Sequence, residues 1–140
     1  MLFRSLAGNE NEDKIVHSIP YVECSRLLEG EKTICIDFRK NKWQRIRFPD
    51  GHDNLYALDI NTDQFAPFYR NGTLLILSQE SEIRRGDRIA VFMSDNSIVI
   101  REFVHRTATT LELKDVLSAD KTSVNVEDIR IVHRIVWASQ

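Results

Sequence analysis

The chain has 140 residues, of which 42% are hydrophobic and 29% are charged, and its formal net charge is −2 at pH 7. This length fits one domain, and the apolar content is enough for a core, which excludes a wholly disordered protein. The weakly acidic balance argues against binding nucleic acid through bulk charge. No apolar run approaches the roughly 20 residues that span a bilayer, and the start lacks a secretory signal, so we expect a cytoplasmic protein with no membrane segment.

Metal and cofactor chemistry has little support in the sequence. The two cysteines, Cys24 and Cys35, and the four histidines are scattered, whereas zinc sites use ligands in close pairs. We therefore expect no metal and no cofactor, and we expect buried thiols, since Cys35 lies inside an apolar run. No glycine-rich phosphate loop and no Gly-x-Ser-x-Gly elbow is present.

Residues 1–17 are polar and acidic without an apolar period, which predicts a linker or disordered tail, and residues 18–140 form the predicted domain. Short β-branched and aromatic runs separated by turn residues indicate strands. The fold class is therefore mostly β, a single domain of short antiparallel strands and hairpins with at most one or two short helical turns. The predicted strands are Ile19–Cys24, Thr33–Phe38, Trp43–Phe48, Leu55–Ile60, Thr73–Leu77, Arg88–Met93, Ile98–Val104, Thr110–Leu113 and Ile129–Trp137.

Helical structure is expected only locally. Gln64–Tyr69 is the predicted helical turn, limited to about one turn by Pro67, and Leu111–Leu117 is compatible with a helical extension. The core is expected from residues that share one parity in each strand. These are Leu58, Ile60, Leu75, Leu77, Ile89, Val91, Ile98 and Ile100.

Two groups of basic residues leave two interpretations open. Alternation around Trp43–Phe48 places Gln44, Ile46 and Phe48 on one face, which is typical of an edge strand protected by charge on its other face. The alternative is a surface for phosphate or an acidic partner. The basic residues are Arg39, Lys40, Lys42, Arg45 and Arg47 in one group and Arg84, Arg85 and Arg88 in the other.

One segment resembles a known family. Thr62-Asp63-Gln64-Phe65-Ala66-Pro67 follows an apolar strand and aligns without a gap with the Gly-Asp-Ser-Met-x-Pro motif of the peptidase-like C-terminal domain of LexA-type and phage-type repressors. The resemblance extends over about Ile19 to Ala138. Its further matches are Ile19-Pro20-Tyr21, Gly72-Thr73, Gly86-Asp87 with the following strand, Ile98–Phe103, and the closing strand Ile129–Trp137.

The resemblance implies that the catalytic dyad is replaced. In the family a serine is the nucleophile and a neutral lysine is its general base, and these positions here are Gln64 and Arg101, with Phe65 in place of the methionine. An amide is no nucleophile, and a guanidinium stays protonated near neutral pH. The sequence therefore predicts no catalytic residues and no enzyme activity.

An unrecognised dyad remains the alternative. Ser94 and Ser97 could pair with Lys114 or Lys121, although a basic lysine needs an apolar surround that these lysines lack in the sequence. The self-cleavage site of the family, commonly Ala-Gly, has its nearest counterpart in Leu28-Glu29-Gly30.

The resemblance also predicts a polar contact between the two former dyad positions, which would close the catalytic cleft of the family. It places Gln64 and Arg101 side by side, so we expect Arg101 to pair with Gln64 or with the neighbouring Asp63, and Glu102 to face the other way. The alternative is that Arg101 extends its charged end to solvent.

The expected function is a non-catalytic regulatory and dimerisation domain of a bacterial or phage transcription repressor, including prophage repressors, that has lost self-cleavage. The alternative is an active autoprotease or signal-peptidase-like serine hydrolase. DNA would be bound only through a helix-turn-helix domain absent from these residues, and a homodimer is the expected partner. The late apolar strand is the expected dimer contact, through Arg130, Val132, Arg134, Val136 and Trp137.

Overall fold

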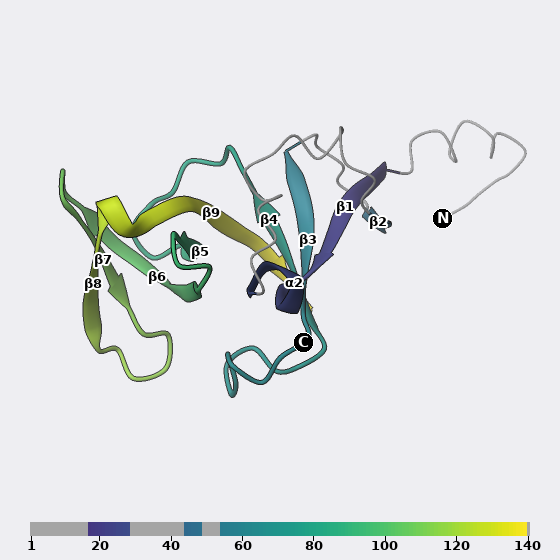
Figure 1. Ribbon diagram of the computed structural model, residues 1–140, viewed down its shortest axis with the longest axis horizontal. Coiled ribbons are helices and arrows are strands. Elements are labelled where there is room, and N and C mark those ends of the chain that lie inside the picture. Colours follow the sequence, from purple (N-terminus) through teal and green to yellow (C-terminus); the bar gives the residue numbers. More distant parts are fainter. Residues whose placement is uncertain (1–16, 29–43, 49–53, 140) are drawn as a thin grey trace, which may run out of the picture.

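The computed structural model describes residues 17–28, 44–48 and 54–139. Within these ranges the chain forms one mixed sheet in the order β2-β1-β3-β4-β9-β5-β6-β7-β8 (Figure 1). The mostly β fold is confirmed, and β1 and β3 are its one parallel pair in the described ranges. The strands are β1 (His17–Glu23), β2 (Gln44–Phe48), β3 (Leu55–Ile60), β4 (Thr73–Ser78), β5 (Arg88–Met93), β6 (Ile98–Arg106), β7 (Thr110–Lys114), β8 (Lys121–Asn125) and β9 (Ile129–Ala138).

The short helix α2 (Cys24–Leu28) was not predicted, because the first strand was extended through Cys24. Its first turn is held from a distance: the backbone N–H of Ser25 donates to Asn61 Oδ1 at 2.9 Å, and Asn61 Nδ2 donates to Ser25 Oγ at 2.8 Å. The local sequence around this helix does not indicate that Asn61, which follows β3, would cap it. The Cys24 thiol is buried, as expected of the cysteines, and burial, with the charge of Asp59 adding, raises its pKa to about 12.

Two further differences concern strands and turns. The polar strand β8 was not predicted; it lies at an edge, pairs only with β7, and turns just Val124 partly inward. The helical extension over residues 111–117 is wrong, since β7 ends at Lys114 and a turn follows. A single 3-10 turn, η2 (Val126–Asp128), precedes β9.

Residues 64–69 form consecutive turns, one of which, from Phe65 to Tyr69, closes with the i→i−4 hydrogen bond of a single helical turn and does not continue into a helix. The backbone N–H of Ala66 donates to the Asp63 carbonyl at 3.1 Å, and that of Tyr69 donates to the Phe65 carbonyl at 2.9 Å. Pro67, which follows a cis peptide bond, has no N–H to continue a helical ladder. The predicted strand at residues 33–38, its following turn, Cys35 and residues 1–16 lie outside the described part of the chain, and β1 begins at His17, the last residue of the predicted linker.

All eight predicted core residues are buried, but they do not share one face. Ile98 and Ile100 pack with Leu58 in the largest core cluster, whereas Ile89 and Val91 belong to a cluster on the opposite face. The reason is that the central strands are covered on both faces: β3 buries Tyr56 and Ala57 on alternate sides. Strict alternation applies to a sheet with one solvent-exposed face, so it missed the residues that β3 to β5 bury on their other face.

Strand β9 joins the two halves of the sheet, because it pairs with β4 on one side and with β5 on the other (Figure 1). The late strand, from which the dimer contact was expected, is therefore a central strand of the described sheet. Bulges break the register beside Arg130 and Val136, so Ile135 packs into the largest core while Trp137 pairs with Ile76 on the opposite face. The strand predicted from Trp43–Phe48 is present as β2, which lies at one end of the sheet formed by the described strands.

His133 sits in the middle of β9 and is 1% exposed. Its Nδ1 shares a hydrogen bond of 2.7 Å with the Tyr56 hydroxyl, and its Nε2 is buried with no hydrogen-bond partner in the described ranges. The rings of Tyr56 and Phe92 meet it edge to face. Burial in these apolar surroundings lowers the pKa of His133 from 6.5 to about 4, because a charged imidazolium would be poorly solvated there.

We expect this histidine to make folding stability depend on pH. Between pH 6.5 and 4 the unfolded chain takes up a proton that the folded chain does not, so stability falls as the pH falls through this range, by up to about 3 kcal/mol. Urea unfolding at several pH values should show this loss in the wild type, and His133→Gln should lack that part of it. Parallel pH profiles for the two proteins would contradict the assignment.

Candidate functional site

A pocket of about 170 Å³ opens where the turns after β3 meet the first half of β6 and the turn after β7. Its lining comes from three segments, which are residues 64–69, residues 100–101 and residues 115–117. Phe65, Phe68 and Leu117 contribute apolar side chains to a lining that also contains Gln64, Arg101 and Asp115. A cavity of about 150 Å³ can hold a benzene-sized group, so this pocket has room for one ring or branched side chain.

The structure brings Gln64 and Arg101, which come from distant parts of the sequence, to this same pocket. Gln64 is exposed in the first of these segments, and its backbone N–H donates to Thr62 Oγ1 at 3.3 Å. Arg101 lies on β6 opposite Ile89 of β5, with its side chain 36% exposed. The pocket is therefore lined by both of the residues that the resemblance was expected to place at the serine and lysine positions.

The partner of Arg101 is Asp115, not Gln64 or Asp63 as predicted. The Nε of Arg101 lies 3.9 Å from Asp115 Oδ2, and Nη1 of Arg101 donates to the carbonyl oxygen of Ile100 at 2.8 Å. Glu102 of β6 lies opposite Lys114 of β7 in the strand register. The residues next to this pair, 101 and 115, are therefore also close in space. If residues 111–117 were helical, as the sequence allowed, residue 115 would not be expected next to residue 101. An antiparallel hairpin of β6 and β7 places the two close together.

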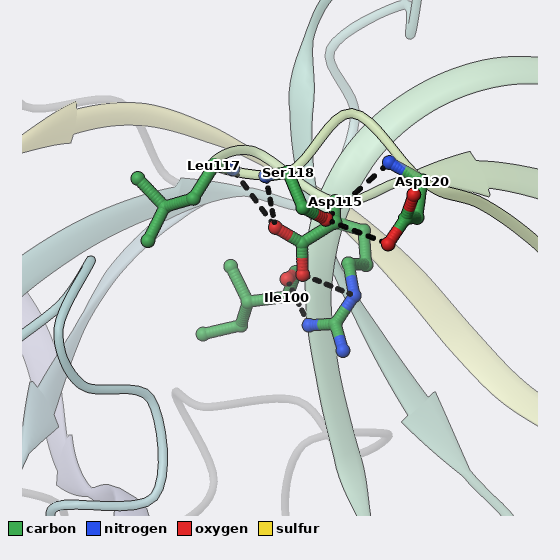
Figure 2. Close-up of polar contacts among 6 residues, drawn as sticks. Ile100, Asp115, Leu117, Ser118 and Asp120 are labelled. Atoms are coloured by element: carbon green, nitrogen blue, oxygen red, sulfur yellow. Dashed lines mark hydrogen bonds and ion pairs between the residues drawn. The ribbon is translucent and has the colours of Figure 1, made fainter.

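Asp115 is fixed by the turn that follows it (Figure 2). Its Oδ1 accepts the backbone N–H groups of Leu117 at 2.8 Å and Ser118 at 3.0 Å, and Ser118 Oγ donates to Asp120 at 3.1 Å. The N–H groups of Ser118 and Leu117, with the nearby charge of Arg101, lower the pKa of Asp115. The Asp115 carboxylate is thus ionised, and backbone N–H groups hold its orientation beside Arg101.

This arrangement predicts an acid-sensitive turn. Because its pKa is lowered by folding, Asp115 contributes stability above its ordinary value of 3.8, and the contribution is lost as the pH falls through the lowered value. The side-chain carboxyl should titrate below 3.8 by NMR. Asp115→Ala should speed amide exchange at Leu117 and Ser118, whereas Asp95→Ala, which removes a comparable turn carboxylate that accepts from Ser97, should leave those amides unchanged.

The residues of the alternative dyad lie apart and are engaged elsewhere. Ser97 Oγ donates to Asp95 in the turn between β5 and β6, and Lys114 Nζ lies 3.8 Å from Glu102. Lys121 is exposed on edge strand β8. Ser94 lies in the same turn as Ser97, and its carbonyl accepts from Arg130. This geometry brings neither serine to a lysine.

Several basic residues have partners within the chain. Arg45 donates to the side chain and the carbonyl of Ser18, at 2.9 and 2.6 Å, and Arg84 lies 3.6 Å from Glu82. The Arg88 guanidinium lies 4.3 Å from the ring centre of Phe68, which lines the pocket. These contacts give Arg45, Arg84 and Arg88 local structural roles. Arg39, Lys40 and Lys42 lie outside the described residues, so the alternative of a phosphate-binding surface around them stays a prediction.

Fewer of the predicted dimer-contact residues of β9 are exposed than expected. Val132 packs beside Val91, Arg134 lies 3.4 Å from Asp87, and Arg130 donates to the Ser94 carbonyl and Asn96. Only Val136 and Trp137 stay exposed, at 40% and 47%.

Comparison with known families gives a match to Peptidase S24-like over residues 26–136. Because this match covers most of the chain, including the pocket and strands β2 to β8 in full, the chain belongs to the Peptidase S24-like family. It is therefore an S24-like peptidase domain in fold. Comparison with curated proteins gives no match. Within the described ranges, no helix has both the length and the apolar character needed to cross a membrane.

Proposed function

We propose that this domain is a non-catalytic regulatory and dimerisation domain of a cytoplasmic transcription repressor, of bacterial or phage origin, that does not cleave itself. The observation that carries the proposal is the pairing of Arg101 with Asp115 in the pocket that also contains Gln64. DNA binding would belong to a helix-turn-helix domain joined to this one.

The chemistry of the pocket supports this proposal. Acyl transfer by a serine and a lysine needs a hydroxyl nucleophile and an amine that can lose its proton. Gln64 offers an amide, which does not attack carbonyls. A guanidinium is a poor general base near neutral pH, and Arg101 lies 3.9 Å from the Asp115 carboxylate. The pocket is suited to binding a small group or a peptide side chain rather than to breaking a bond.

The alternative, an autoprotease with a different dyad, has weaker support. It would require Ser97 to leave Asp95 and Lys114 to leave Glu102 and become neutral. Lys114 is half-exposed beside a carboxylate, whereas a lysine that acts as a general base needs an apolar surround.

We expect the purified chain to remain intact at alkaline pH, as measured by mass spectrometry over time. The double variant Gln64→Ser, Arg101→Lys should also remain intact, because Leu28-Glu29-Gly30 is a poor cleavage sequence. A specific internal cut in the wild type would contradict the proposal, and loss of that cut in Ser97→Ala would identify the alternative dyad.

The homodimer is proposed to form through the exposed end of β9. Trp137 is half-exposed, its ring centre lies 5.8 Å from that of Phe48, and both line a hollow of about 560 Å³. Half-exposed aromatic residues of this kind are frequent anchors of protein interfaces. A second copy of the chain is the occupant that a dimerisation domain requires.

Sedimentation should show a dimer at high micromolar concentration. Trp137→Ser should weaken it by about tenfold or more, since a buried aromatic anchor contributes strongly to binding. Leu117→Ser is the matched control, because Leu117 is 60% exposed but lies at the pocket. A monomer throughout, or equal weakening by both variants, would contradict this interface.

A further inference from the structure

The pocket that contains Gln64 and Arg101 also holds two opposite charges side by side. Arg101 Nε lies 3.9 Å from Asp115 Oδ2, which is longer than a hydrogen bond, and each of the two side chains is 36% exposed. A partly exposed ion pair at this distance contributes little to stability. Both groups can therefore take a further partner without losing a strong contact.

Each member of this pair keeps hydrogen-bonding capacity. Arg101 uses Nη1 for the carbonyl oxygen of Ile100, and its Nη2 makes no hydrogen bond to any of the described residues. The N–H groups of Leu117 and Ser118 are accepted by Asp115 Oδ1, which leaves Oδ2 facing Arg101. A guanidinium has five N–H donors, and a carboxylate accepts at both oxygens. The pair thus presents an unused donor next to an unused acceptor.

Beside the charged pair lies an apolar surface that the described chain leaves uncovered. Leu117 is 60% exposed, and Phe65 and Phe68, which also line the pocket, are only partly buried. Figure 2 shows the side chains of Leu117 and Ile100 extending to one side of the Asp115 carboxylate. The volume of about 170 Å³ has room for one ring or one branched side chain. The pocket therefore combines a dipolar end with an apolar end.

We propose that this pocket binds a free apolar α-amino acid of about the size of leucine or phenylalanine. Its carboxylate accepts from Arg101 Nη2, and its ammonium group donates to Asp115 Oδ2. Its side chain lies against Phe65, Phe68 and Leu117. An α-amino acid carries its two opposite charges on one carbon atom, so it matches a pair of protein charges that are themselves only 3.9 Å apart.

Ligands with a single charge match the pocket less well. A carboxylate alone is repelled by Asp115, and an amine alone is repelled by Arg101, because the two protein charges are too close for a ligand to meet only one. The terminal residue of a peptide carries only one of the two charges next to its side chain. The pocket is therefore selective for the free amino acid. This inference rests on the proposed function, since it assigns the non-catalytic pocket a ligand.

The first test is a titration of the wild-type chain with L-phenylalanine, followed through backbone amide NMR shifts. Three compounds each remove one of the expected contacts: hydrocinnamate lacks the ammonium group, phenethylamine lacks the carboxylate, and glycine lacks the side chain. We expect saturable shifts at Leu117 and Ser118 with L-phenylalanine, and binding weaker by about tenfold or more for each of the other three, since each loses one contact.

The second test uses variants. Arg101→Gln and Asp115→Asn should each weaken L-phenylalanine binding by about tenfold, because each removes one charge that the ligand meets. Asp115→Asn keeps a carbonyl oxygen for the N–H groups that now bind the carboxylate, so the turn is preserved. The matched controls are Arg106→Gln, at the exposed end of β6, and Asp95→Asn, in the turn between β5 and β6; both should bind as the wild type does.

The series of compounds is measured on the wild type, so it decides the matter even if a variant does not fold. No saturable shift with L-phenylalanine at millimolar concentration, or equal affinity for hydrocinnamate, would overturn the proposal. Shifts confined to the surroundings of Trp137 would do the same, because they would place the ligand in the other hollow. A chain that binds nothing but stays intact and dimeric would contradict this inference alone, whereas a chain that cuts itself would contradict the proposed function.

Discussion

The pairing of β9 with both β4 and β5 is the constraint on which this fold depends. Without it, the strands β1 to β4 and the strands β5 to β8 would share no ladder, because no other described strand joins the two groups. The position explains why β9 buries His133 at its centre, and why two bulges are needed to match its side chains to cores on both faces. It also explains why an apolar terminal segment need not signal a free edge.

The pocket is a consequence of this arrangement. Once β5 is fixed against β9, β6 follows it as a hairpin and presents Arg101 beside the turns that follow β3. Those turns come from the other half of the sheet. The candidate site is therefore assembled from both halves, with Asp115 supplied by the turn after β7.

Much of the fold could be predicted from the sequence, because the apolar strands β3 to β6 and their glycine and asparagine turns carry strong local signals. Elements defined by distant contacts could not: α2 depends on a cap from Asn61, and β8 on the β7 edge beside it. The site shows the same division. The motif around Gln64 and the strand of Arg101 were found by resemblance, but the ion pair with Asp115 depends on a hairpin register that composition does not reveal.

The central place of β9 has a consequence for how the chain reaches this structure. Its partner β4 lies far back in the sequence, with Leu75 opposite Ala138, so the ladder that unites the sheet has a long sequence separation. Such non-local pairings slow folding, since the entropy of closing a long loop is lost before the contact is gained. The hairpins on either side can form early from local contacts, but β4 and β5 expose unpaired edges until β9 is inserted between them. The interval before that insertion is the stage at which this domain is most open to misassembly.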